Sequence, residues 1–187
     1  RVRGCPFAAD PSQQLARMEG HEIMPLIEGA TFLFTNEYEA ALIEQKTGWG
    51  SADISAIVET RITTLGPDGA RVERRGEAPV TVTVAEEDRK VDPTGVGDAF
   101  RAGYLSGQAW GLADERSAQI GALLATYVIE TMGTQEYELA QRHFLERKAR
   151  AYGDDAAAEV EPHPCTWRPA SWPGGAPTRE ACCPSAD

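Results

Sequence analysis

The sequence predicts an α/β fold in which a central, mainly parallel sheet is flanked by helices. Apolar runs of strand length alternate with helical patterns along much of the chain, an order typical of parallel sheets. With 42% hydrophobic residues, the 187-residue chain can build one core of ordinary size. It contains no internal repeat of fixed period, so a solenoid is not expected.

The first elements follow from short local signals. Residues 5–11 are predicted to form a short buried strand ending at Asp10, and Ser12 is placed to cap a helix that begins at Gln13. Pro25 is expected to divide the next helical stretch, because proline removes a backbone hydrogen bond inside a helix. The predicted order is therefore a strand, a helix and an interrupted helix.

A second strand and helix follow. Residues 30–35 are a continuous apolar run of strand length, and Thr35 or Asn36 can cap the helix behind them. A short helix is expected over 51–58, before the β-branched run 61–65, which favours a strand. The order of strand then helix is thus repeated.

The remaining chain is expected to contain a hairpin and three helices. Gly-Pro-Asp-Gly at 66–69 is a turn by composition, and 80–84 alternates like a strand that can pair with 70–74 in an antiparallel ribbon. The three helices are predicted over 98–110, 114–132 and 136–152. The helix over 114–132 is apolar over most of its circumference and is therefore expected to be deeply buried.

The chain is predicted to divide into one domain and a tail. Residues 1–153 carry the elements above, whereas 154–187 hold six of the twelve prolines without hydrophobic periodicity and are expected to be disordered. Cys5 is the only cysteine before residue 165, which indicates a reducing compartment and hence a cytoplasmic location. The three cysteines of the tail contain no Cys-x-x-Cys pair, so a zinc site is not expected there.

Composition argues against two classes of partner. A formal net charge of −11 repels phosphate backbones, so a nucleic-acid partner is not expected. The longest mainly apolar run, 121–129, is far shorter than the roughly 18 residues that a membrane span needs, so no membrane partner is expected either. The chain is therefore expected to be soluble.

The stretch Asp-Pro-Thr-Gly-Val-Gly-Asp at 92–98 places two glycines and an acid at a predicted helix start. Glycines let the backbone approach a ligand closely, and the free amides of a first helical turn attract an oxyanion or a phosphoryl group. Asp98 is placed to accept a proton from a hydroxyl group that attacks phosphorus. The alternative is a glycine-rich turn in which Asp98 only caps the helix. Neither a Gly-Lys-Ser/Thr loop nor a glycine three residues after Gly97 is present, which excludes Walker and Rossmann motifs.

This stretch, extended to Gly103, resembles the second signature of the ribokinase-like (PfkB) sugar and nucleoside kinases. Four further segments resemble the bacterial type of adenosine kinase, and they occur in the same order: Phe-Ala-Ala-Asp-Pro-Ser-Gln-Gln-Leu-Ala-Arg at 7–17, Phe-Thr-Asn-Glu-Tyr-Glu at 34–39, Thr-Thr-Leu-Gly-Pro-Asp-Gly at 63–69 and Gly-Thr-Gln-Glu at 133–136. The resemblance covers about residues 5–160 and corresponds to the C-terminal half of such an enzyme. It implies a partial ribokinase-like fold, with ATP and Mg²⁺ as cofactors.

The resemblance places the chemistry at the glycine stretch. It implies that Asp98 is the catalytic base, and that the backbone amides of Gly95, Val96 and Gly97 form the anion hole for the γ-phosphoryl group. Val96 stands where the family commonly has a smaller residue. Because an anion hole of backbone amides does not depend on the side chain, we expect Val96 to change substrate choice or loop mobility rather than to abolish the hole.

Asn36 and Glu39 match the family's Asn-x-x-Glu motif. The resemblance implies that these two residues help to organise magnesium and phosphate through water. Asparagine followed three residues later by glutamate is also a helix capping box, which is the reading that the residues by themselves favour. The two roles are compatible.

Two further segments are implied to contact the substrates. Thr64, Gly66 and Gly69 match the strand-to-turn segment that lies along the ATP phosphates and ribose in the family, although these residues are also typical of an ordinary tight turn. Gln13 and Gln14 follow a strand end where a nucleoside base can lie, and glutamine amides can pair with an adenine edge. The alternative for both glutamines is a position on the exposed face of a helix.

The activity expected from the resemblance is transfer of the ATP γ-phosphoryl group to the 5′-hydroxyl of adenosine, with ADP and AMP as products. A sugar acceptor and a catalytically silent nucleotide-binding fragment are the alternatives. The family's ribose-binding acids and lid precede the matched half, so residues 1–187 alone are expected to lack phosphotransferase activity. The expected partner is a small-molecule nucleoside or sugar, and the sequence does not decide between a monomer and a homodimer.

Overall fold

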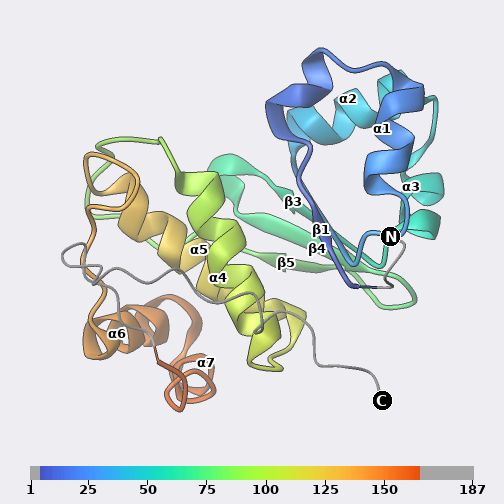
Figure 1. The fold of residues 1–187 in the computed structure, drawn as a ribbon. Helices are drawn as coiled ribbons and strands as arrows, with labels where there is room; N and C mark the ends of the chain where they lie inside the picture. Colours follow the sequence, from blue (N-terminus) through green and yellow to red (C-terminus); the bar gives the residue numbers. More distant parts are fainter. Residues whose placement is uncertain (1–4, 165–187) are drawn as a thin grey trace.

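The computed structural model describes residues 5–164, which form a five-stranded sheet with helices on both faces (Figure 1). The strands are β1 (Ala8–Ala9), β2 (Phe32–Asn36), β3 (Thr60–Thr64), β4 (Ala70–Arg74) and β5 (Val80–Val82). They lie in chain order; β1, β2 and β3 are parallel, and β4 and β5 each run antiparallel to the preceding strand. The predicted α/β class and the β4–β5 ribbon are thus confirmed. In this part of the chain, each helix is too short or too polar to cross a membrane.

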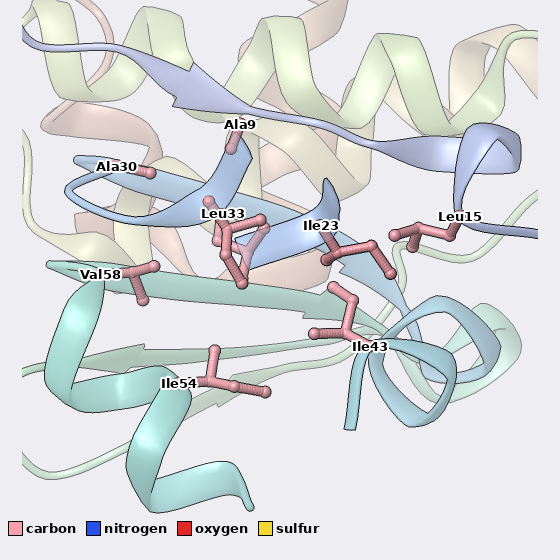
Figure 2. Close-up of a cluster of buried hydrophobic side chains, with 9 residues drawn as sticks. Ala9, Leu15, Ile23, Ala30, Leu33, Ile43, Ile54 and Val58 are labelled. Carbon is pink, nitrogen blue, oxygen red and sulfur yellow. The ribbon is translucent and has the colours of Figure 1, made fainter. Parts of the chain in front are cut away.

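The first hydrophobic core lies between the sheet and three helices on one face (Figure 2). The helices are α1 (Gly20–Ile27), α2 (Glu37–Thr47) and α3 (Ser51–Ile57). Ile23, Ile43 and Ile54 each come from one of these helices and pack in the same cluster as Leu33 of β2. All four side chains are at most 1% exposed. Burial of such a side chain contributes about 1.5–3 kcal/mol, so this cluster fixes the three helices on the sheet.

The second core lies on the opposite face of the sheet, because side chains alternate along β2 and Phe34 points away from Leu33. It is covered by α4 (Val96–Ala109) and α5 (Asp114–Ile129). The rings of Phe34 and Tyr104 meet edge to face, with 5.7 Å between their centroids. Helices α4 and α5 cross closely, since a Cβ atom added at Gly103 would lie 2.7 Å from the Cα atom of Gly121. Glycine at the crossing therefore lets the two helices pack as one layer.

A polar network joins β4 to α4 and α5. The Asp114 side chain is 8% exposed and accepts hydrogen bonds from Nε and Nη2 of Arg74, each over 2.7 Å. It also accepts from the Tyr104 hydroxyl over 2.7 Å and from Gln108 Nε2 over 3.0 Å. Burial alone would raise the pKa of Asp114, but the bonds from Arg74 and Tyr104 outweigh it and hold the pKa below its ordinary value. The carboxylate is thus stabilised in its charged form.

Two C-terminal helices, α6 (Gln141–Tyr152) and α7 (Asp154–Ala158), follow in the chain and pack outside α5. Phe144 and Val160 join a third core in which Leu123 of α5 is fully buried. The predicted tail therefore begins too early at residue 154. Its first residues include Ala156 and Val160, which are fully buried because they form a small apolar face against the domain. The rest of that tail, 165–187, lies outside the described residues, and so do its three cysteines.

Three local predictions are corrected by the structure. Ser12 does not cap a helix; it is the first residue of the 3₁₀ helix η1 (Ser12–Ala16), has a φ of +47° and follows Pro11, which makes no side-chain capping bond. Pro25 lies inside α1 instead of dividing it, because the His21 carbonyl that loses its partner belongs to an exposed residue and can bind water. The helix predicted from 136 begins at 141, since Tyr137 packs against the third core from a loop.

Candidate active site

A cavity of about 580 Å³ lies at the carboxyl ends of β2 and β3 and beside the first turn of α4. Carboxyl ends of strands are the usual ligand site of open α/β sheets, and the volume lies within the roughly 300–1,000 Å³ of small-molecule sites. The cavity brings together residues from three separate segments that the sequence analysis selected. Those lining it are Asn36, Thr64, Gly66, Gly69, Val96 and Gly97.

The rest of the cavity wall is largely apolar. Ala122, Ala125 and Ile129 of α5 line it, together with Phe100 of α4 and Val84 beyond β5. An aromatic base has apolar faces that gain from contact with such a wall. The glycines and Asn36 lie elsewhere on the lining, where backbone and amide groups are available for polar parts of a ligand. The cavity thus offers both an apolar surface and a polar surface to a ligand.

The glycine loop before α4 is held by Asp92. Its carboxylate accepts hydrogen bonds from the amide of Thr94 over 2.9 Å and from the amide of Gly133 over 3.1 Å. The bonds from Thr94 and Gly133 lower the pKa of Asp92 below its ordinary value. Gly95 follows with a φ of +84°, a conformation that glycine adopts without strain. A Cβ atom at Gly95 would also lie 2.9 Å from the Thr134 side chain, so the loop has no room for one.

The amides of this loop differ in their availability. The Val96 amide donates to the Pro93 carbonyl over 3.3 Å, so one of the three amides assigned to the anion hole already has a backbone partner. Gly97 is in the first turn of α4, whose amides have no acceptor inside the helix. Because the partial positive charge of the helix dipole is concentrated at this end, Gly97 is placed to bind an anion.

Asp98 follows Gly97 and has an 83% exposed side chain. It is not the N-cap of α4, which is Gly95, and the N-cap makes no side-chain bond. Instead, Asp98 Oδ1 accepts from Arg101 Nη1 over 2.8 Å. The alternative in which Asp98 only caps the helix therefore does not describe its contacts. Asp98 directly follows Gly97, which lines the cavity, but its own largely exposed side chain is not part of the lining.

Asn36 and Glu39 form the predicted capping box at the start of α2. Asn36 Oδ1 accepts from the Glu39 amide over 2.8 Å, and Glu39 Oε2 accepts from the Asn36 amide over 2.8 Å. Among residues 5–164, no group of three or more His, Cys, Asp or Glu side chains is placed to hold a metal directly. Each member of the box has a second polar atom outside the box, and Mg²⁺ usually keeps several of its waters. Asn36 lines the cavity and can contact the water shell of such an ion, whereas Glu39 is 7% exposed and does not line the cavity.

The segment after β3 is the tight turn that its composition predicts, the 3₁₀ turn η2 (Gly66–Asp68). Gly66 has a φ of +58° and Gly69 a φ of +98°, and the Leu65 amide donates to the Gly69 carbonyl over 2.8 Å. A Cβ atom at Gly69 would overlap the carbonyl of Val82 in β5. Glycine thus lines the cavity with backbone atoms alone, which allows close approach of a ligand.

Gln13 and Gln14 are not among the cavity residues. Both are exposed on η1. Three further predicted site residues, Glu39, Gly95 and Asp98, do not line the cavity either, although each is next to or near a residue that does. Sequence reasoning overlooked Lys90, which lines the cavity and pairs with Glu87 over 2.9 Å. The sequence signal that could have identified Lys90 is its position two residues before Asp92, where the glycine stretch begins. It also overlooked Arg101, whose spacing of three residues from Asp98 on one helix permits the observed ion pair.

Fold and site together define an α/β domain with a cavity of small-molecule size at the carboxyl ends of β2 and β3. The chain belongs to the pfkB family of carbohydrate kinases, whose family model matches residues 4–141. The ribokinase-like fold implied by the sequence is confirmed by similarity to solved structures of that kind. A nucleoside kinase from Burkholderia thailandensis in complex with inosine has a TM-score of 0.76 and 34% identity, over 79% of this chain and 49% of that one. Another structure of that enzyme is a complex with ADP-inosine.

Two other relatives agree with this placement. The nucleoside kinase of Methanocaldococcus jannaschii is 30% identical over 126 residues, which are 67% of this chain and 41% of that protein. The adenosine kinase from Sinorhizobium meliloti has a TM-score of 0.57 and 27% identity, over 64% of this chain and 37% of that one. The chain thus spans about half, or less, of the length of these relatives.

Proposed function

We propose that this chain is the nucleotide-binding part of an ATP-dependent nucleoside kinase, which transfers the γ-phosphoryl group to the 5′-hydroxyl of adenosine. The observation that carries the proposal is one cavity that joins the Gly66–Gly69 turn, the amide end of α4 and an apolar wall, with Asp98 in that first turn of α4. An ADP complex of the B. thailandensis relative supports an adenine nucleotide as the cavity ligand.

In the proposed reaction, Asp98 accepts the proton of the attacking hydroxyl group. The hydroxyl oxygen forms a bond to the γ-phosphorus, the bond from that phosphorus to the bridging oxygen of ADP breaks, and ADP leaves. The amides at the start of α4, with Gly97 foremost, stabilise the negative charge on the transferred group. Mg²⁺, held through water by Asn36 and Glu39, would neutralise charge on the phosphates.

The acceptor is proposed from the relatives and from the residues near Asp98. Two of the similar proteins are named nucleoside kinases, one of them in complex with inosine, and a third is named an adenosine kinase. Gln13 and Gln14 are exposed three and four residues after Asp10, which is linked to Arg101 beside Asp98. Their amides can pair with a purine edge. A sugar is the second candidate, because the family model is named for carbohydrate kinases.

Filling the apolar wall is expected to impair ATP binding. Ala125 lines the cavity from α5, and an indole ring in its place would occupy the space that we assign to the adenine base. We expect Ala125→Trp to raise the Kd for ATP at least about tenfold, which corresponds to about 1.4 kcal/mol of binding free energy. The measurement is an NMR titration of residues 1–187 with ATP, a method that also reports weak binding.

Ala52→Trp is the matched control, because Ala52 is exposed on α3 and does not line the cavity. It is expected to leave the affinity for ATP unchanged. The nucleotide assignment is contradicted if the two variants bind ATP equally well, or if ATP perturbs no resonance from the cavity in the unmodified chain.

A further inference from the structure

The guanidinium group of Arg101 lies between two carboxylates from different parts of the chain. Its Nη2 donates to Asp10 Oδ1 over 3.0 Å and its Nε lies 2.9 Å from Asp10 Oδ2 in an ion pair, while its Nη1 donates to Asp98 Oδ1 over 2.8 Å. Asp10 follows β1, whereas Asp98 and Arg101 are on α4, so the bridge joins residues 91 positions apart. It links the start of α4 to the chain beyond the edge strand.

This bridge is well suited to orient Asp98. With 83% of its side chain exposed, Asp98 has room to change rotamer. Arg101 is only 22% exposed, and the contacts of its Nη2 and Nε atoms with the two oxygens of one carboxylate restrict the plane of its guanidinium group. A Cβ atom at Gly97 would lie 3.2 Å from Arg101 Nη1, so this group also packs against the backbone at the start of the helix. Asp98 is thus hydrogen-bonded to the Arg101 guanidinium group, which is itself held by Asp10 and by the backbone at Gly97.

The charges around Arg101 support the same role. The pKa of Asp10 is raised above its ordinary value, mainly by burial and further by the negative charges of Glu39 and Asp98, while Arg101 opposes the rise. Without the guanidinium charge, Asp10 and Asp98 would repel each other. Arg101 therefore offsets part of the repulsion between the two carboxylates while it donates a hydrogen bond to each of them.

We propose that Arg101 is a positioning residue, which holds the carboxylate of Asp98 toward the attacking hydroxyl group by bridging it to Asp10. This inference rests on the proposed function, in which Asp98 is the base. Arg101 acts through Asp98 and does not itself contact the transferred phosphoryl group. Lysine could not replace it, because a single ammonium group lacks the planar fork that bonds both carboxylates.

The kinetic test uses a protein as long as the related kinases, in which residues 1–187 form one part. We expect Arg101→Gln to lower kcat by about 10- to 100-fold, the scale on which misplacement of a catalytic group acts, while KM for ATP stays within about threefold. Arg142→Gln is the matched control, because Arg142 forms an exposed helical ion pair with Glu146 on α6 and should leave kcat unchanged. An unchanged kcat in Arg101→Gln overturns the proposal.

A double variant separates positioning from a direct or a structural role. If Arg101 acts through Asp98, Arg101→Gln in the Asp98→Asn background should lower kcat by less than about threefold, because the residues form one unit. A further loss of about tenfold or more in that background would mean that Arg101 acts independently and would overturn the proposal.

The bridge itself is tested without activity, by carbon-13 NMR titration of the Asp10 carboxyl in residues 1–187. Because Arg101 lowers the pKa of Asp10, that pKa should be higher in Arg101→Gln than in the unmodified chain. An unchanged pKa overturns the bridge and with it the positioning role. If the unmodified full-length protein transfers no phosphoryl group to any acceptor, the proposed function has failed, and the titration still decides whether Arg101 is paired with Asp10.

Discussion

Replacing Asp98 with asparagine is expected to lower kcat for phosphoryl transfer by about 10²-fold or more, since a positioned base contributes about 10²- to 10⁴-fold. The variant keeps the size of the side chain but cannot accept the proton of the attacking hydroxyl group. ATP affinity should change little, because the cavity is lined by other residues and the Asp98 side chain is largely exposed. The measurement is steady-state kinetics of a protein of the relatives' full length that carries this chain.

Asp155→Asn serves as the matched control, because Asp155 is an exposed aspartate in the first turn of α7. Its kcat should equal that of the unmodified protein. A turnover of Asp98→Asn within about tenfold of the unmodified protein would remove Asp98 from the role of base. Loss of stability with kcat intact would instead indicate a structural role at the start of α4.

Removing the carboxylate of Asp114 is expected to have the largest effect on stability. Asp114→Ala leaves the Arg74 guanidinium and the Tyr104 hydroxyl without their buried acceptor. Breaking a buried ion pair costs about 3–5 kcal/mol, and we expect about 3 kcal/mol here because Arg74 is 22% exposed and has Glu59 within 3.2 Å as a second partner. Chemical denaturation of residues 1–187 at pH 7 measures this loss.

Glu115→Ala is the control, since Glu115 lies in the same first turn of α5 but is 54% exposed. It should cost less than about 1 kcal/mol, as exposed pairs do. The loss in Asp114→Ala should also depend on pH. The folded pKa of Asp114 is lowered, so its stabilisation is fully present above the unfolded value of 3.8 and fades as the pH falls through the folded value. Equal losses in the two variants at pH 7 would contradict the assigned network.

The parts of the site that the sequence predicted are those built from neighbouring residues. The capping box needs only Asn36 and Glu39, the tight turn needs Gly66 to Gly69, and the helix start needs the glycines before Asp98. Each of these features depends on local backbone geometry, which residue type and spacing largely determine. Their roles toward ATP, Mg²⁺ and the acceptor came from resemblance and remain proposals.

The parts that the sequence did not predict depend on contacts between distant segments. The apolar wall comes from α5, whose helical pattern indicates burial but not the partner, and the bridge from Arg101 to Asp10 spans most of the matched region. Pro25 was expected to divide a helix, yet helix α1 is held by packing of its buried face against the first core. Composition also placed the start of the tail too early, because the packing of Val160 is a tertiary contact.

The most direct measurement is transfer of label from γ-labelled ATP to adenosine, inosine, ribose and fructose by a protein of the relatives' full length that carries this chain. The proposed function predicts labelled nucleoside 5′-monophosphate, with adenosine or inosine preferred over both sugars, and strong loss of label transfer in Asp98→Asn. Label transfer to a sugar alone would contradict the nucleoside acceptor. Failure to label any of the four acceptors, with ATP bound in the cavity, would contradict the assignment of this chain to a working nucleoside kinase.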